Sequence, residues 1–295
     1  MAPLVPAFAL AIAAACALVQ LLPEPGGAMA APAGFRWITY ANTALAGAAA
    51  VYFVYYWLGF EQVGRSASLL AALGALGIPL GLLADAAQAA PLRGPGPGFG
   101  LYEGTALFSA ATVWLYLAME RVYRNRTAAL LIMPAVLLAV LCEMWLIAQG
   151  VAAPGRPAPP LSGYWVLGQR FSASLGYGAL AVSAACGILV LARGAAGARA
   201  VATQAQLIVG AAAIGAPMLL IGTGMGAVWS FMRGGGIGLD GAGTTLPALL
   251  AAVALLAWVR RCGPGIRRVA WSALVVFAVS ATGLLVGSRS VETFS

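Results

Sequence analysis

Residues 127–149 read TAALLIMPAVLLAVLCEMWLIAQ, and this stretch decides the fold class. Almost all of its side chains are apolar, and Glu143 is its only charged residue. A helix needs about 20 apolar residues to cross the roughly 30 Å hydrocarbon core of a bilayer. The stretch therefore predicts a transmembrane helix.

The same pattern recurs along the whole chain of 295 residues. Hydrophobic residues make up 62% of it and charged residues 8%, whereas soluble proteins carry about 25% charged residues. This composition excludes a soluble fold, a disordered chain and a disulfide scaffold. We predict an all-α fold, a polytopic membrane helix bundle of about eight or nine transmembrane helices, forming a single integral membrane domain over residues 1–295. The predicted spans are 4–22, 38–60, 68–90, 102–119, 127–149, 165–192, 205–231, 245–259 and 266–287.

The first of these segments, 4–22, has two interpretations. It is followed by Ala28-Met29-Ala30, which resembles a cleavage site and favours a signal peptide. No positive residue precedes the segment, although a signal peptide usually carries one there. We therefore favour a retained helix, with the cleaved signal peptide as the alternative.

The chain contains no histidine and no lysine, so all 16 of its positive side chains are arginine. Because the chain has no histidine, no imidazole can act as a general base, a zinc ligand or a haem ligand. Without lysine, Schiff-base chemistry and a Walker-type phosphate site are excluded. We assign no catalytic residue and no metal ligand. The arginines lie in short gaps between apolar segments, so the net charge of +8 predicts the lipid bilayer as partner rather than a nucleic acid.

The arginines also predict the orientation of the chain. Ten of them lie in four short alternate loops, and six are spread over the longer loops and a terminus. By the positive-inside rule, the first set faces the cytoplasm. The N-terminus is then cytoplasmic and the C-terminus periplasmic or extracellular, as in a multi-pass protein of a bacterial-type inner membrane. The first set consists of Arg65, Arg121, Arg124, Arg126, Arg193, Arg199, Arg260, Arg261, Arg267 and Arg268.

Five polar side chains fall within or beside the predicted spans, all towards the outer face. Ionisable groups at membrane depth are costly and are therefore functional candidates. Glu103 opens a helix, where its carboxylate would act as a cap. Glu143 would either pair with Arg170 or contact a substrate. The sequence offers no chain of carboxylates through the membrane midplane, which disfavours a proton pump. The five candidates are Asp85, Glu103, Glu143, Gln169 and Arg170.

Aromatic and glycine residues supply two further signals. Tyr164, Trp165 and Trp229 lie at predicted outer span ends, where they form either an interfacial aromatic belt or a platform for stacking a porphyrin. Two G-x-x-x-G pairs, which begin at Gly77 and Gly222, let helix backbones approach closely. We expect that packing inside the chain, with a dimer interface as the alternative.

Several stretches together resemble a known family. They are GLYEG at 100–104 followed by an apolar helix and YRNR at 123–126, LSGYWVLGQ at 161–169, IGAPMLLIG at 214–222 with GAVW at 226–229, and GIRRVAW at 265–271. Their order and spacing resemble the cytochrome c assembly family of haem-handling membrane proteins, which are CcsA-, CcmC- or HemX-like. The first stretch is similar to the family's LYES segment. The resemblance covers roughly residues 100–290 and leaves the helices of residues 1–99 outside it.

The chain departs from the family pattern at its haem-binding positions. Gln169 stands where the family has an outer-face histidine. The outward loop 233–245 reads RGGGIGLDGAGTT, without the family's W-G-x-x-W-x-W-D motif, and keeps only Asp240 as an acidic residue. Residues 287–294, GSRSVETF, lack the second histidine. Bis-histidine haem ligation by this chain is therefore excluded.

Three functions remain open. The resemblance implies a divergent cytochrome c assembly protein that contacts haem without ligating it through histidine, with Arg170 or Arg233 meeting a propionate. The alternative is a non-catalytic scaffold or accessory subunit that binds other membrane subunits or a cytochrome c biogenesis partner. A small-solute transporter is disfavoured because no paired interrupted segments occur. The cofactor-binding candidates are Trp165, Gln169, Arg170, Met225, Trp229, Met232, Arg233 and Asp240.

Overall fold

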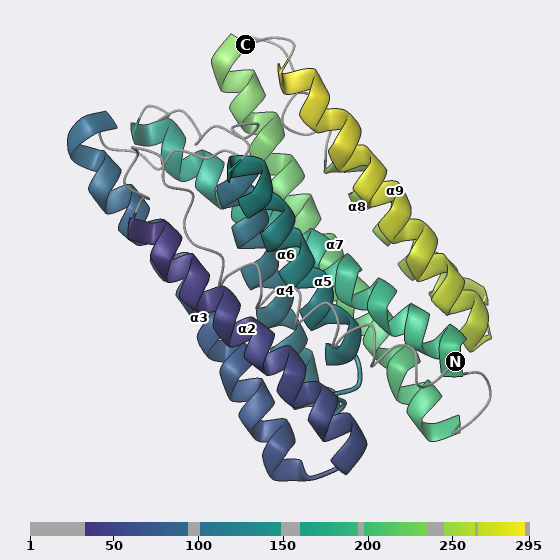
Figure 1. The fold of residues 1–295 in the computed structure, drawn as a ribbon. Coiled ribbons are helices and arrows are strands. Elements are labelled where there is room, and N and C mark those ends of the chain that lie inside the picture. Colours follow the sequence, from purple (N-terminus) through teal and green to yellow (C-terminus); the bar gives the residue numbers. More distant parts are fainter. Residues whose placement is uncertain are drawn as a thin grey trace. The chain divides into compact units, whose positions relative to one another are not determined.

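The computed structural model is helical throughout the residues that it describes, which are 33–93, 101–148, 160–193, 198–234, 245–262 and 265–292 (Figure 1). Within these ranges there are eight helices and no strands. The all-α prediction is therefore confirmed for this part of the chain. The helices are α2 (Ala33–Leu58), α3 (Glu61–Arg93), α4 (Leu101–Tyr123), α5 (Ala129–Ala148), α6 (Pro160–Arg193), α7 (Ala198–Gly234), α8 (Leu246–Cys262) and α9 (Ile266–Glu292).

These helices coincide with eight of the nine predicted segments, and the segment 4–22 lies outside the described residues. Over the described part, three helices contain stretches long and apolar enough to cross a membrane: Glu61–Ala84, Gly168–Ala192 and Ala202–Val228. These apolar helices indicate a membrane protein. The total of eight or nine spans stays a prediction.

Several helices begin earlier than the apolar pattern predicts. Helix α3 begins at Glu61 rather than at residue 68, and α6 begins at Pro160 rather than at residue 165. Apolar periodicity marks the residues that meet hydrocarbon, whereas backbone hydrogen bonding continues into the polar flanks. Proline suits the first position of α6 because it has no N–H to leave unpaired there.

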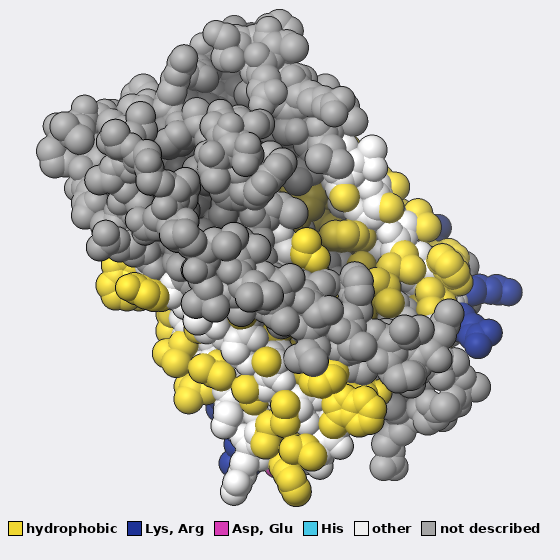
Figure 2. All heavy atoms as spheres, in the orientation of Figure 1, with side chains coloured by type: hydrophobic (Ala, Val, Ile, Leu, Met, Phe, Trp, Pro, Cys, Tyr) yellow, Lys and Arg dark blue, Asp and Glu magenta, His cyan; other side chains and the backbone are white. Residues whose placement is uncertain are grey.

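Large apolar side chains point outward along α3. Five leucines, spaced alternately four and three residues apart, form one exposed stripe on this helix: Leu69, Leu73, Leu76, Leu80 and Leu83. Yellow apolar side chains dominate the described surface in Figure 2, and dark-blue arginines appear in only a few places. Such a stripe is a liability in water but suits a helix that faces lipid. The surface therefore agrees with the membrane class.

The chain divides into two compact units, Met1–Tyr164 and Trp165–Ser295. In the first unit, α2 and α3 run side by side as a hairpin, shown in purple and blue in Figure 1, and α5 also packs on α2. A Cβ atom on Gly77 would lie 2.9 Å from the Cβ of Ala41. This close approach confirms, at Gly77, the packing predicted for its G-x-x-x-G pair.

Two turns at one end of the first unit have defined backbone signals. Gly59 follows α2 with a φ of 69°, and its N–H donates to the Tyr55 carbonyl at 2.8 Å. Glycine adopts this left-handed conformation without steric cost, which ends the helix. Between α4 and α5, the Asn125 Oδ1 accepts a hydrogen bond from the Thr127 N–H at 3.1 Å. This side chain closes an Asx-type turn just before α5.

In the second unit, α6 packs on α7, and α7, α8 and α9 contact one another. A Cβ atom on Gly222 of α7 would lie 3.2 Å from the Ala173 nitrogen of α6, which confirms the predicted close packing at Gly222. The Gly187 position of α6 similarly approaches the Ala270 carbonyl oxygen of α9. Small residues therefore set the distances between these helices.

Candidate functional site

The first candidate site lies where α6 meets α7. The indole Nε1 of Trp165 donates to the backbone carbonyl of Met225 at 2.8 Å. A Cβ atom on Gly168 would lie 2.7 Å from the Met225 Cε, so the thioether side chain lies over this glycine. The structure thus brings together two of the predicted cofactor-binding residues, Trp165 and Met225. Trp165 lies in the stretch 161–169 that carries the family resemblance, and Met225 directly precedes the stretch 226–229 that also carries it.

Neighbouring polar groups complete this first site. Gln169 and Arg170 follow Trp165 on α6, and both are half-buried. On α7, the Thr223 Oγ1 lies 2.8 Å from the Oγ1 of Thr245. Thr245 is buried and begins α8, since its carbonyl accepts a hydrogen bond from the Leu249 N–H at 3.0 Å. The start of α8 is therefore tied to α7 at Thr223, two residues before Met225.

The remaining sequence candidates are placed only in part. Trp229, Met232 and Arg233 lie in the last turns of α7, and their side chains are outside the described residues. The same holds for the side chains of Asp85 in α3, Glu103 in α4 and Glu143 in α5, while Asp240 lies wholly outside the described ranges. The pairing of Glu143 with Arg170 therefore stays a prediction.

The described donors of the first site do not fit a haem iron ligated by this chain. The chain has no histidine, the Trp165 N–H is already donated, and the Met225 thioether is packed on Gly168. Within the described ranges, no three His, Cys, Asp or Glu side chains gather as a metal site would require. The site offers a flat ligand the ring of Trp165 and the methyl group of Met225. These surfaces would bind such a ligand by burial and stacking.

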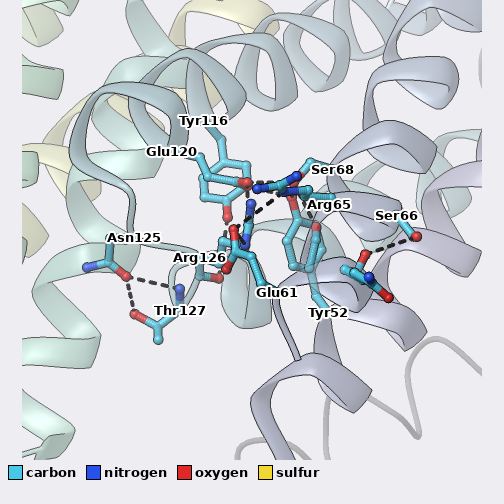
Figure 3. Close-up of polar contacts among 12 residues, drawn as sticks. Tyr52, Glu61, Arg65, Ser66, Ser68, Tyr116, Glu120, Asn125, Arg126 and Thr127 are labelled. Carbon is cyan, nitrogen blue, oxygen red and sulfur yellow. Dashed lines mark hydrogen bonds and ion pairs between the residues drawn. The ribbon is translucent and has the colours of Figure 1, made fainter. Parts of the chain in front are cut away.

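A second candidate site centres on a buried carboxylate in the first unit, shown in Figure 3. Glu120, near the end of α4, is 6% exposed. Its Oε2 accepts a hydrogen bond from the Tyr52 hydroxyl of α2 at 2.6 Å. Its Oε1 accepts one from the Ser68 hydroxyl of α3 at 2.5 Å and one from the Arg126 Nε at 2.8 Å. One side chain therefore joins three helices and the α4–α5 turn.

Arg126 links this carboxylate to a second one. Its Nη1 lies 2.8 Å from the Oε1 of Glu61, the first residue of α3, and its guanidinium carbon lies 5.4 Å from the centre of the Tyr55 ring. Burial acts to lower the pKa of Arg126, but hydrogen bonds to Glu120 and Glu61 outweigh this and raise the pKa further above its ordinary value. The guanidinium stays charged and balances the buried Glu120.

Glycine makes room for this guanidinium. A Cβ atom on Gly64 would lie 2.7 Å from the Arg126 Nη1 and 2.9 Å from the Tyr55 ring. The Tyr116 hydroxyl donates to the Arg126 carbonyl at 3.3 Å and so holds the turn from the other side. We name Tyr52, Ser68, Glu120 and Arg126 the carboxylate lock. With both carboxylate oxygens occupied by protein donors, this arrangement fixes helices rather than presenting a reactive group.

The sequence pattern did not predict the carboxylate lock. The predicted span 102–119 stops one residue before Glu120, and Arg126 enters the sequence predictions as a topology signal and as part of the resembling stretch 123–126. A glutamate at the end of an apolar helix, six residues before an arginine in the following turn, is the signal that would have found it. The structure does place Arg126 beside the α3 start that carries Arg65 and Glu61, so two of the loops predicted to be cytoplasmic share one end of the first unit.

No family model, curated protein or solved structure matches the chain. The resemblance to the cytochrome c assembly family therefore stays a prediction.

Proposed function

We propose that this chain is a divergent membrane protein of the cytochrome c assembly type. It takes part in haem handling or cytochrome c biogenesis at the outer face of a bacterial-type inner membrane and does not ligate haem iron itself. The observation that carries the proposal is the contact between Trp165 and Met225. The stretch 161–169, which resembles the family, meets α7 there, beside the start of the second resembling stretch 226–229. Both helices contribute apolar surface to one place.

We propose the topology together with the function. The chain crosses the membrane eight or nine times in all, with about 20 residues per span, with its N-terminus in the cytoplasm. The ion pair between Arg126 and Glu61 supports a common side for two arginine-bearing loops. In cells, alkaline phosphatase fused to the C-terminus should be active, and fused after Arg126 it should be inactive. The reverse pattern would contradict the orientation.

Haem titration tests the ligand. Ferric haem added to the purified full-length protein should quench tryptophan fluorescence to saturation without producing the spectrum of a bis-histidine haem, because no histidine is present. Trp165→Leu should weaken binding by about tenfold, which corresponds to one aromatic stacking contact, whereas Trp165→Phe should retain binding. Trp114→Leu on α4 of the first unit is the matched control and should change nothing.

Two results of this titration would contradict haem handling by this chain. One is the absence of saturable quenching after reconstitution. The other is equal haem affinity in the wild type and in Trp165→Leu, which would move the ligand away from the Trp165–Met225 contact.

A second candidate function is a scaffold that holds partner subunits. The observation that favours it is the use of the Trp165 N–H and the Met225 thioether in contacts inside the protein. Mild detergent extraction distinguishes the two functions. A scaffold should co-purify with stable membrane partners and remain colourless, whereas migration as a lone monomer would oppose it.

A further inference from the structure

Four arginines gather at one end of the α8–α9 hairpin. Arg260 and Arg261 lie in the last turn of α8, and Arg267 and Arg268 lie in the first turn of α9. The two helices pack on each other, and only residues 263–265 separate them in the chain. The Arg268 N–H donates to the Gly265 carbonyl at 2.8 Å at the start of α9. All four side chains are exposed. We name these four residues the arginine turn.

The arginine turn has no carboxylate to balance it in the described part of the chain. Ion pairs there involve only Arg65 and Arg126, and their partners are Glu61 and Glu120. The acidic residues nearest to the arginine turn in the sequence are Asp240 and Glu292, each about twenty residues away or more. Arg267 and Arg268 also lie at the N-terminal end of α9, where the helix dipole disfavours cations. Among the described residues, no acidic side chain compensates the four charges at this hairpin end.

Exposed apolar side chains lie close to the arginine turn in the sequence of α9. Trp271 lies one turn further along α9 and is 60% exposed, and Ile266 beside the arginines is 37% exposed. An exposed indole next to cationic side chains is the composition found where a helix passes from hydrocarbon to headgroups. A soluble acidic protein would match the arginines but would leave Trp271 and the outward leucine Leu250 of α8 without a partner.

We infer that the arginine turn is a binding site for the phosphate groups of anionic phospholipids. Each guanidinium presents a planar set of donors that matches a phosphate oxygen pair, and arginine is weakly hydrated compared with lysine. The acyl chains of the same lipid would cover Trp271. Each arginine close to an anionic surface strengthens attraction by roughly fivefold, so four together select strongly for anionic over zwitterionic lipid. This inference does not depend on the proposed function.

Brominated lipids test the inference directly, because bromine quenches the fluorescence of a tryptophan that it touches. Full-length protein is reconstituted in phosphatidylcholine vesicles that contain brominated phosphatidylglycerol or, at the same fraction, brominated phosphatidylcholine. The signal of Trp271 is isolated by subtracting the spectrum of Trp271→Phe. We expect the brominated anionic lipid to quench Trp271 several-fold more efficiently, and we expect high salt to remove the difference.

Two variants decide the outcome. Arg267→Gln/Arg268→Gln should abolish most of the preference for phosphatidylglycerol, whereas Arg65→Gln/Arg124→Gln in the first unit should preserve it. Circular dichroism of both variants checks that the helices remain. Equal quenching by the two lipids in the wild type would overturn the inference, and so would a preference that survives in Arg267→Gln/Arg268→Gln or in high salt. Inorganic phosphate should not compete, which separates a lipid site from a site for the free anion.

Discussion

Glu120→Ala is expected to be the most destabilising single substitution in the first unit. It removes the acceptor for the Tyr52 hydroxyl, the Ser68 hydroxyl and the Arg126 Nε in one step. Removing one member of a buried ion pair costs about 3–5 kcal/mol. In Glu120→Ala, Arg126 would lose its buried partner and keep only its pair with the exposed Glu61. The change in unfolding free energy can be measured by denaturant titration of the purified protein in detergent, followed by circular dichroism.

A second substitution, at Arg126, tests whether the loss of stability in Glu120→Ala comes from the guanidinium. If the loss of the buried partner of this guanidinium dominates the cost, then Arg126→Met introduced into Glu120→Ala should recover part of the stability, although Arg126→Met alone destabilises. Glu61→Ala is the matched control, since Glu61 also pairs with Arg126 but its side chain is 59% exposed. Exposed pairs contribute about 0–1 kcal/mol, so this variant should lose little. Equal losses for Glu61→Ala and Glu120→Ala would contradict the buried role of the carboxylate lock.

The apolar helices could be predicted from the sequence because a long run of apolar residues is a pattern that needs no tertiary information. Residues 127–149 and 205–231 are examples, and helices α5 and α7 occupy both ranges. Their exact limits could not be predicted, since the polar residues at 61–67 extend α3 by hydrogen bonding rather than by apolarity. The apolar composition of a segment predicts that it forms a helix, whereas backbone hydrogen bonds determine where that helix begins and ends.

The carboxylate lock lay beyond sequence reasoning for a different reason. Tyr52, Ser68 and Glu120 are far apart in the chain, and only the packing of α2, α3 and α4 brings them together. A single sequence contains no measure of that packing. The contact between Trp165 and Met225 was closer to prediction, because both residues were placed towards the outer face. That the indole would donate to a backbone carbonyl could not be foreseen, since the direction of a ring depends on its neighbours.

Gly215→Ala is expected to have the largest effect in the second unit, although it adds a single methyl group. A Cβ atom at this position would lie 2.8 Å from the Cβ of Ala179 and 3.1 Å from the Gly176 carbonyl oxygen of α6. Neither neighbour is the end of a flexible side chain, so α6 and α7 themselves must move apart. Overpacking of this kind costs about 1–3 kcal/mol.

Another glycine of α7, Gly224, supplies a control for which the expected change in stability has the opposite sign. A Cβ atom on Gly224 would have no neighbour within 4 Å, so Gly224→Ala adds a methyl group to open space. Replacing glycine by alanine in a helix interior stabilises it by about 0.5–1 kcal/mol. Denaturant titration should therefore shift to lower midpoints for Gly215→Ala and to equal or higher midpoints for Gly224→Ala. Because both substitutions have the same helix propensity, their difference isolates contact between α6 and α7. A stabilising Gly215→Ala would mean that the two helices do not approach each other at this glycine.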